Sequence, residues 1–257
     1  MLEKPLHNIF YFALFLTLSI SCGSRTDSSQ EIIIASGANL QFALTEIADI
    51  FTEEYPYPVT FVWGSTGSLT HQIENGAPYD IFFAADESFM NRLREEGYLL
   101  GDSAQSFVTG RLAIGVNRAV KNKIRALNDF LNGDIRSIAI ASPEHAPYGL
   151  AAKEALINAG LWEQLQNKIV YAENIRQCLQ FIETGNADAG IVSANIPPVE
   201  GVSTILVDSS LYTPPRQSFA ILKKSGKAEQ AQVFLSFIKE QKSVGILTKY
   251  SYRLIKN

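Results

Sequence analysis

The sequence contains few cysteines and histidines. Of its 257 residues, two are cysteine and three are histidine. His7, His71 and His145 lie far apart, and none has a second histidine at the spacing of a metal-binding motif. Cys22 lies close to the N-terminus in a leader-like segment, which leaves Cys178 without an expected partner. These scarcities exclude a disulfide-stapled fold and argue against a metal site.

The sequence also has no large excess of positive or negative charge. The chain has 26 acidic and 22 basic residues, a formal net charge of −4, and no cluster of lysine and arginine. A nucleic-acid-binding surface needs such a cluster, so no nucleic-acid partner is expected. The hydrophobic content of 46% is ordinary for a folded globular protein.

Only one long apolar run occurs, at residues 9–20, and it is too short to span a bilayer as a helix. It is followed by Ser21-Cys22-Gly23-Ser24, in which a small residue precedes a cysteine, as at a bacterial lipoprotein cleavage site. We predict that residues 1–22 are a signal peptide with lipid attached at Cys22, and that residues 23–30 form a flexible tether. The alternative is an ordinary signal peptide with an incidental cysteine.

From residue 31 onward, strand-like apolar runs alternate with helical patterns. The run at 31–36 precedes a helical face formed by Leu40, Leu44, Ile47 and Phe51. Further strands are predicted at 59–63, 79–84, 137–141, 168–171 and 187–192, with one extended segment at 107–116 and a mostly helical stretch at 228–250. Repeated strand–helix units predict an α/β fold with mainly parallel sheets flanked by helices.

Two sets of such units, each of roughly a hundred residues, predict two lobes. Residues 31–110 and 216–257 are assigned to lobe 1, and residues 111–215 to lobe 2. The chain then crosses twice between the lobes, near Arg111 and near Pro214-Pro215. Cys178 is expected to be a small buried hydrophobic residue within a helix of lobe 2.

Four strand-to-helix junctions, at 36–39, 64–68, 143–149 and 173–175, are rich in small and polar residues. A helix start leaves backbone N–H groups without partners and carries the positive end of the helix dipole. Four starts directed at one point would form an anion site without a charged side chain. The hydroxyls of Ser65 and Thr66 and the amide of Asn39 are further candidate donors. Taken singly, each junction is also explained by helix capping, for which Asn39 and Asn174 are well suited.

The same junctions resemble those of a known family, the periplasmic molybdate-binding proteins of ABC transporters. The similarity extends from about residue 32 to the C-terminus. Its most specific blocks are Gly-Ala-Pro-Tyr-Asp at 76–80 and Pro-Glu-His-Ala-Pro-Tyr-Gly at 143–149. Similar stretches also occur at 35–40, 64–75, 84–86, 142, 152–156 and 189–192.

This resemblance implies a two-lobed periplasmic-binding-protein-like fold of type II, with two hinge crossings and no enzymatic activity. It implies molybdate or tungstate as the ligand, no cofactor, and an ABC permease as the membrane partner of a lipid-anchored, periplasmic or cell-surface monomer. By position, the implied ligand contacts are Asn39 and Thr66 in lobe 1 and the backbone at Tyr148 and Ile175 in lobe 2. The candidate set also includes Ala38, Ser65 and Ser193, the last of which replaces a ligand-contacting tyrosine of some members.

Two alternatives stay open at this point. Within the same class, the ligand is another tetrahedral oxyanion such as sulfate or phosphate. In a different class, the chain is a secreted hydrolase that uses the carboxylates of Asp80, Asp86 and Glu144. Capping and strand-end roles explain these acids more simply. Arg176, beside the fourth junction, is expected to form a surface salt bridge rather than to bind the anion.

Overall fold

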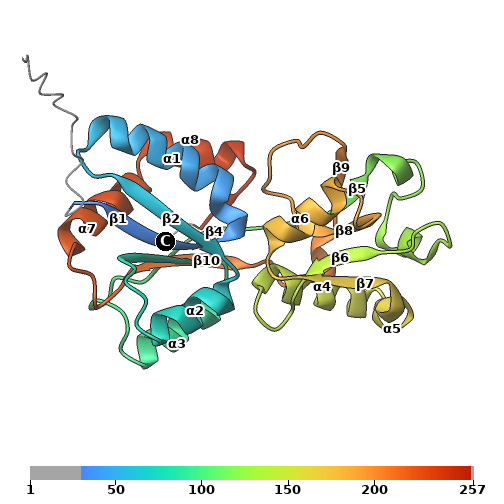
Figure 1. The fold of residues 1–257 in the computed structure, drawn as a ribbon, viewed down its shortest axis with the longest axis horizontal. Coiled ribbons are helices and arrows are strands. Elements are labelled where there is room, and N and C mark those ends of the chain that lie inside the picture. Colours follow the sequence, from blue (N-terminus) through green and yellow to red (C-terminus); the bar gives the residue numbers. More distant parts are fainter. Residues whose placement is uncertain (1–29, 256–257) are drawn as a thin grey trace, which may run out of the picture.

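The computed structural model describes residues 30–255. The predicted signal peptide, Cys22 and the tether up to residue 29 lie outside the described residues. Two separate sheets, one of six strands and one of five, occupy the two halves of the molecule (Figure 1). Each sheet is flanked by helices, so the predicted α/β fold with two lobes is confirmed.

The first sheet is mixed. Its strands, in spatial order, are β11 (Arg253–Leu254), β4 (Gln105–Thr109), β10 (Arg216–Ile221), β3 (Ile81–Ala84), β1 (Ile32–Gly37) and β2 (Val59–Gly64). β1 is parallel to both β2 and β3, whereas β10 pairs antiparallel with β3 and β4. One face is covered by α1 (Gln41–Glu54), α7 (Ala228–Phe237) and α8 (Gln241–Lys249), and the other by α2 (Thr66–Glu74) and α3 (Glu87–Glu95).

The second sheet repeats this plan with five strands. In spatial order they are β7 (Ile169–Ala172), β6 (Ile138–Ala141), β8 (Ala189–Ser193), β5 (Leu112–Asn117) and β9 (Val202–Leu206). β6 is parallel to β7 and β8, and β5 is antiparallel to its neighbours. Figure 1 shows α6 (Ile175–Glu183) on one face, with α4 (Pro147–Asn158) and α5 (Trp162–Leu165) on the other. The short 3₁₀ helices are η1 (Ala38–Leu40), η2 (Arg118–Val120), η3 (Leu127–Leu131), η4 (Gln166–Lys168) and η5 (Ser209–Leu211).

Burial follows the predicted helical pattern. Leu40, Leu44, Ile47 and Phe51 are all fully buried, which confirms the apolar face of the first helix. Cys178 is a buried free thiol in α6, also as predicted. The helical stretch at 228–250 consists of two helices, α7 and α8, and α8 packs against α1 on the first sheet.

The extended segment predicted at 107–116 consists of two strands, β4 and β5, separated by Gly110 and Arg111. β4 belongs to the first sheet and β5 to the second, and the chain crosses between them at Gly110 and Arg111. The two strands differ in composition, since three of the five residues of β4 are polar whereas β5 is apolar up to Asn117. The sequence had placed the crossing near Arg111, but not the exact ends of the two strands. The chain returns between β9 and β10, and the N–H of Gly110 donates to the carbonyl of Pro215 at 3.0 Å, joining the two crossings.

The exact residue boundaries of the two lobes, 31–110 with 216–257 and 111–215, remain a prediction. Over residues 30–255, no helix has both the length and the apolarity needed to cross a bilayer.

Candidate binding site between the lobes

A small cavity lies between the two sheets, where β1, β2 and β7 end and the loop after β6 leads into α4, and the centre of a water-sized sphere can occupy about 10 Å³ of it. It is lined by Gly37, Ala38, Asn39, Gly64, Ser65, Thr66 and Ala85 from one side, and by Ala146, Pro147, Tyr148, Asn174 and Ile175 from the other. Sites for drug-sized ligands enclose about 300–1,000 Å³, so this cavity suits a smaller guest. Within the described part of the chain, its lining includes no charged side chain.

The structure brings six of the seven sequence-predicted contact residues together in this cavity. They are Ala38, Asn39, Ser65, Thr66, Tyr148 and Ile175. Ser193, the seventh, is fully buried at the end of β8 and does not line the cavity. Its hydroxyl donates to Oδ1 of Asn195 at 3.3 Å and accepts the N–H of the same residue at 3.1 Å.

Two helices of the second lobe begin at the cavity. In α4, Pro147 has no N–H group, so Tyr148 supplies the first amide of the helix. In α6, the side chain of Asn174 accepts the N–H groups of Arg176 and Gln177, both at 3.0 Å, which confirms the predicted cap. This cap satisfies the second and third amides and leaves the first, that of Ile175, without an acceptor inside its own helix.

Thr66 begins α2 and contributes a side-chain donor as well. Its Oγ1 accepts the N–H of Ala85 at 3.1 Å, so the hydroxyl hydrogen is left for a ligand. The hydroxyl of Ser65 donates instead to Oγ of Ser68 at 2.7 Å. Thr66 is therefore the better hydroxyl donor of the two.

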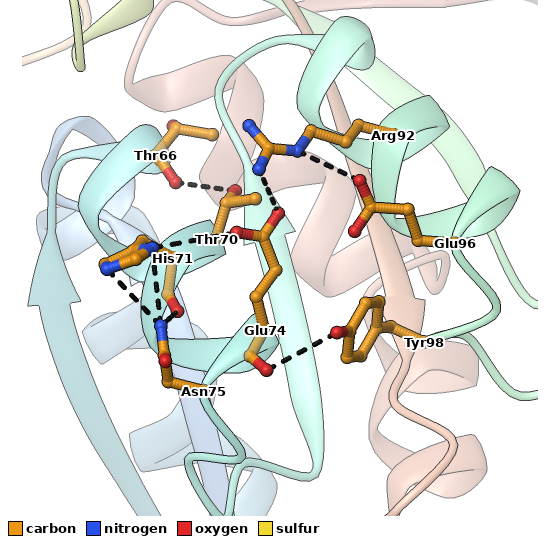
Figure 2. A network of polar contacts seen from close by, with 8 residues as sticks. All are labelled: Thr66, Thr70, His71, Glu74, Asn75, Arg92, Glu96 and Tyr98. Carbon is orange, nitrogen blue, oxygen red and sulfur yellow. Dashed lines mark hydrogen bonds and ion pairs between the residues drawn. The ribbon is translucent and has the colours of Figure 1, made fainter.

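Helix α2 is held against α3 by a polar network, shown in Figure 2. Arg92 forms ion pairs with Glu74 at 2.7 Å and with Glu96 at 3.4 Å, and the hydroxyl of Tyr98 donates to the carbonyl of Glu74 at 3.4 Å. His71 extends from the same helix with an exposed side chain. Because these contacts fix the C-terminal end of α2 at Glu74, they help to hold the orientation of the helix, whose N-terminus faces the cavity.

Asn39 does not cap a helix, and that expectation is wrong. The chain enters α1 through the 3₁₀ turn η1, which places Asn39 inside the turn, and Gly37 occupies the capping position. Nδ2 of Asn39 donates to Oε1 of Gln217 at 2.8 Å and to the hydroxyl of Tyr252 at 3.3 Å. Both hydrogens of the side-chain amide nitrogen are therefore used in contacts outside the cavity. The donor of Asn39 that remains for a ligand is its backbone N–H.

The two lobes touch at the mouth of the cavity. The N–H of Gly67 in α2 donates to the carbonyl of His145, in the loop before α4, at 2.8 Å. The guanidinium of Arg176 lies 5.5 Å from the ring centroid of Phe42 on the other lobe. Arg176 also pairs with Glu183 at 3.3 Å, which confirms its predicted salt bridge. These contacts describe a closed arrangement of the lobes.

The phenol of Tyr148 lies behind the cavity, between the lobes. It accepts from Nε2 of Gln217 at 3.2 Å and donates to Oδ1 of Asn195 at 3.4 Å. Burial raises the pKa of this phenol above its ordinary value, so the group stays neutral. The site thus combines neutral hydroxyls with helix-start amides.

The carboxylates of the hydrolase alternative have structural roles. Asp80 accepts the N–H of Ile33 at 2.8 Å, and Asp86 caps α3 by accepting the N–H of Ser88 at 2.8 Å. Glu144 is exposed, and none of the three acids lines the cavity. Between residues 30 and 255, no group of three or more His, Cys, Asp and Glu residues is arranged to hold a metal ion.

The sequence model for bacterial extracellular solute-binding proteins matches residues 32–253. The chain belongs to this family. The resemblance inferred from the junction motifs is thereby confirmed, and the hydrolase alternative finds no support among its relatives.

Three similar proteins show how closely this solute-binding protein matches its relatives. The molybdate-binding protein ModA of Rhodobacter capsulatus is 34% identical over 223 residues, which cover 86% of this chain and 88% of the relative. YvgL of Bacillus subtilis, named as a substrate-binding lipoprotein of an ABC transporter, is 27% identical over 96% of this chain and 97% of the relative. The solved periplasmic molybdate-binding protein of Azotobacter vinelandii superposes with a TM-score of 0.82 at 30% identity, over 88% of this chain and 100% of that chain.

Proposed function

We propose that this solute-binding protein captures molybdate or tungstate between its lobes and delivers it to an ABC permease. The observation that carries the proposal is a small cavity lined from both lobes by helix starts and by no charged side chain. The relatives named as molybdate-binding proteins support the same ligand.

The proposed contacts are donors of hydrogen bonds. They are the backbone N–H groups of Asn39, Thr66, Tyr148 and Ile175 together with the hydroxyl of Thr66, and Ala38 and Ser65 flank them. A fully ionised tetrahedral oxyanion presents acceptors in all directions and matches such a set. A protonated anion brings a hydrogen that these donors cannot accept, so phosphate is disfavoured near neutral pH. Ser193 is left out of this set because it does not line the cavity.

Binding and closure are one process in this proposal. The anion is first held by the helix starts of one lobe, and closure then adds those of the other lobe and removes water. The closed form, in turn, is the shape presented to the permease. We infer that the protein works as a monomer tethered to the outer side of a bacterial membrane by lipid on Cys22, an anchor that the lipoprotein relative supports.

Calorimetric titration tests the ligand directly. The purified protein is titrated with molybdate, tungstate, sulfate and phosphate at one ionic strength, and tight one-to-one binding is expected for molybdate and tungstate only. Tighter binding of sulfate than of molybdate would support the alternative oxyanion receptor. Absence of one-to-one binding for all four anions would contradict the proposal.

A further inference from the structure

Gln217 is a buried side chain that bonds to both walls of the cavity without lining it. It lies at the start of β10, immediately after the second crossing, and is fully buried. Its Oε1 accepts from Nδ2 of Asn39 at 2.8 Å, and its Nε2 donates to the hydroxyl of Tyr148 at 3.2 Å. Asn39 and Tyr148 line the cavity from opposite lobes. A single carboxamide thus holds one residue of each wall.

The backbone around Gln217 departs from regular pairing. In the β10–β4 ladder, Gln217 faces Val108 and Ser218 faces Ser106, so the register passes over Phe107. Such a bulge increases the local twist and redirects side chains, and bulges are frequent beside functional sites. The shift in register therefore lies directly beside Gln217, whose carboxamide bonds to Tyr148 of the other lobe.

The partner of Gln217 in the second lobe lies against the other crossing. A Cβ atom on Gly110 would lie only 1.9 Å from the hydroxyl of Tyr148, so the phenol occupies the space left by this glycine. Asn195, which accepts from the same hydroxyl, also accepts the N–H of Arg111 at 3.1 Å. The phenol of Tyr148 is therefore enclosed by both chain crossings.

We propose that Gln217 is a positioning residue that aligns the two walls of the cavity in the closed form. Opening the lobes separates Tyr148 from Asn39, and one carboxamide then cannot reach both. The two hydrogen bonds of Gln217 consequently stabilise closure, although Gln217 does not touch the ligand. This inference rests on the proposed function, since it assigns Gln217 to the affinity for the oxyanion.

The test compares Gln217→Met, which keeps the length of the side chain and removes both hydrogen bonds, with Ser218→Ala. Ser218 is an equally buried neighbour, and its hydroxyl has no hydrogen-bond partner among the described residues. In calorimetry with molybdate, Gln217→Met should bind about tenfold to a hundredfold more weakly at unchanged stoichiometry. The loss should appear mainly as faster dissociation in stopped-flow measurements, because closure holds the ligand in. Ser218→Ala should bind like the unmodified protein.

A double-mutant cycle separates positioning from a general structural role. Tyr148→Phe removes the hydroxyl that Gln217 contacts and leaves the backbone N–H in place. If Gln217 acts through Tyr148, the loss of binding free energy in the double variant is smaller than the sum of the losses in the two single variants. The two losses are then not additive. Additive losses, or a molybdate affinity of Gln217→Met within about twofold of the unmodified protein, would overturn the inference while leaving the proposed function intact.

Two further outcomes complete the test. If Gln217→Met does not fold, Tyr148→Phe alone decides: the inference predicts an affinity loss of about fivefold or more, and an affinity within about twofold overturns it. If the unmodified protein binds no oxyanion, the proposed function and this inference both fail.

Discussion

Gly67 and His145 meet backbone to backbone across the mouth of the cavity. The N–H of Gly67 donates to the carbonyl of His145 at 2.8 Å, and a Cβ atom on Gly67 would lie 2.9 Å from the same oxygen. Gly67 lies within α2 of the first lobe, and His145 lies in the loop before α4 of the second. The lobes can therefore approach this closely between α2 and the loop before α4 because Gly67 has no side chain.

Gly67→Ala should weaken molybdate binding about tenfold without destabilising the unliganded protein. The added methyl group collides with backbone atoms of the other lobe only when the lobes close. Gly67 is the second residue of α2, where alanine favours the helix over glycine by at most about 1 kcal/mol, so the melting temperature of the open form should stay the same or rise. Calorimetry and thermal unfolding of the same samples check both halves of the prediction.

Gly245→Ala is the matched control. Gly245 also lies inside a helix, α8, but a Cβ atom there would meet nothing within 4 Å. The gain in helix propensity should be similar and molybdate binding unchanged. Equal affinities of the Gly67 and Gly245 variants would mean that the contact with His145 is not part of the ligand-bound state.

Thr66→Val should reduce molybdate affinity roughly tenfold to a hundredfold. Valine keeps the shape of threonine but lacks the hydroxyl hydrogen, and it leaves the N–H of Ala85 without its acceptor. Hydrogen bonds to charged groups contribute about 1.5–3 kcal/mol, which sets this range. Thr66→Ser keeps the hydroxyl and should bind within a few-fold of the unmodified protein in the same titration. Equal losses in both variants would assign the effect to packing rather than to the donor.

Arg176→Ala should weaken binding by no more than about fivefold. The guanidinium pairs with Glu183 and lies over the ring of Phe42, and a partly exposed contact of this kind contributes about 0.5–1 kcal/mol to closure. Arg176 does not line the cavity. Titration at low and moderate salt measures the effect, and complete loss of binding would show that a charged side chain holds the anion.

The residues lining the cavity were largely predictable because their signals are local. A small or polar residue between an apolar strand and an apolar helix marks each junction, as at Ser65 and Asn174. Parallel strands bring such junctions to one edge of a sheet. The convergence of the junctions followed from that rule, and the assignment of Thr66, Tyr148 and Ile175 followed from the family resemblance.

The polar contacts behind the cavity were missed because their partners are distant in the sequence. Asn39 lies 178 positions from Gln217 and 213 positions from Tyr252, and no local pattern joins them. The capping role expected for Asn39 failed for the same reason, since tertiary contacts took its side chain. The crossing near Arg111 followed from the division into two sets of strand–helix units, but the exact strand ends at Thr109 and Leu112 did not follow from the hydrophobic pattern.

The stability of the folded protein should fall as the pH rises above about 10. Burial raises the pKa of the Tyr148 and Tyr252 phenols above the ordinary tyrosine value of about 10, which the unfolded chain retains. Above that pH the unfolded chain binds fewer protons than the native one, so stability present below pH 10 is lost by up to about 1.4 kcal/mol per pH unit for each phenol. Urea unfolding at pH 9, 10 and 11 measures this slope.

Tyr148→Phe removes one of the two phenols, those of Tyr148 and Tyr252, whose pKa burial raises, and should make the decline between pH 10 and 11 shallower. Tyr171→Phe, at a half-exposed position on β7, is the control and should leave the slope as it is in the unmodified protein. The comparison isolates burial because both changes remove the same hydroxyl. A slope equally steep in all three proteins would mean that the Tyr148 phenol is not kept neutral by its position between the lobes.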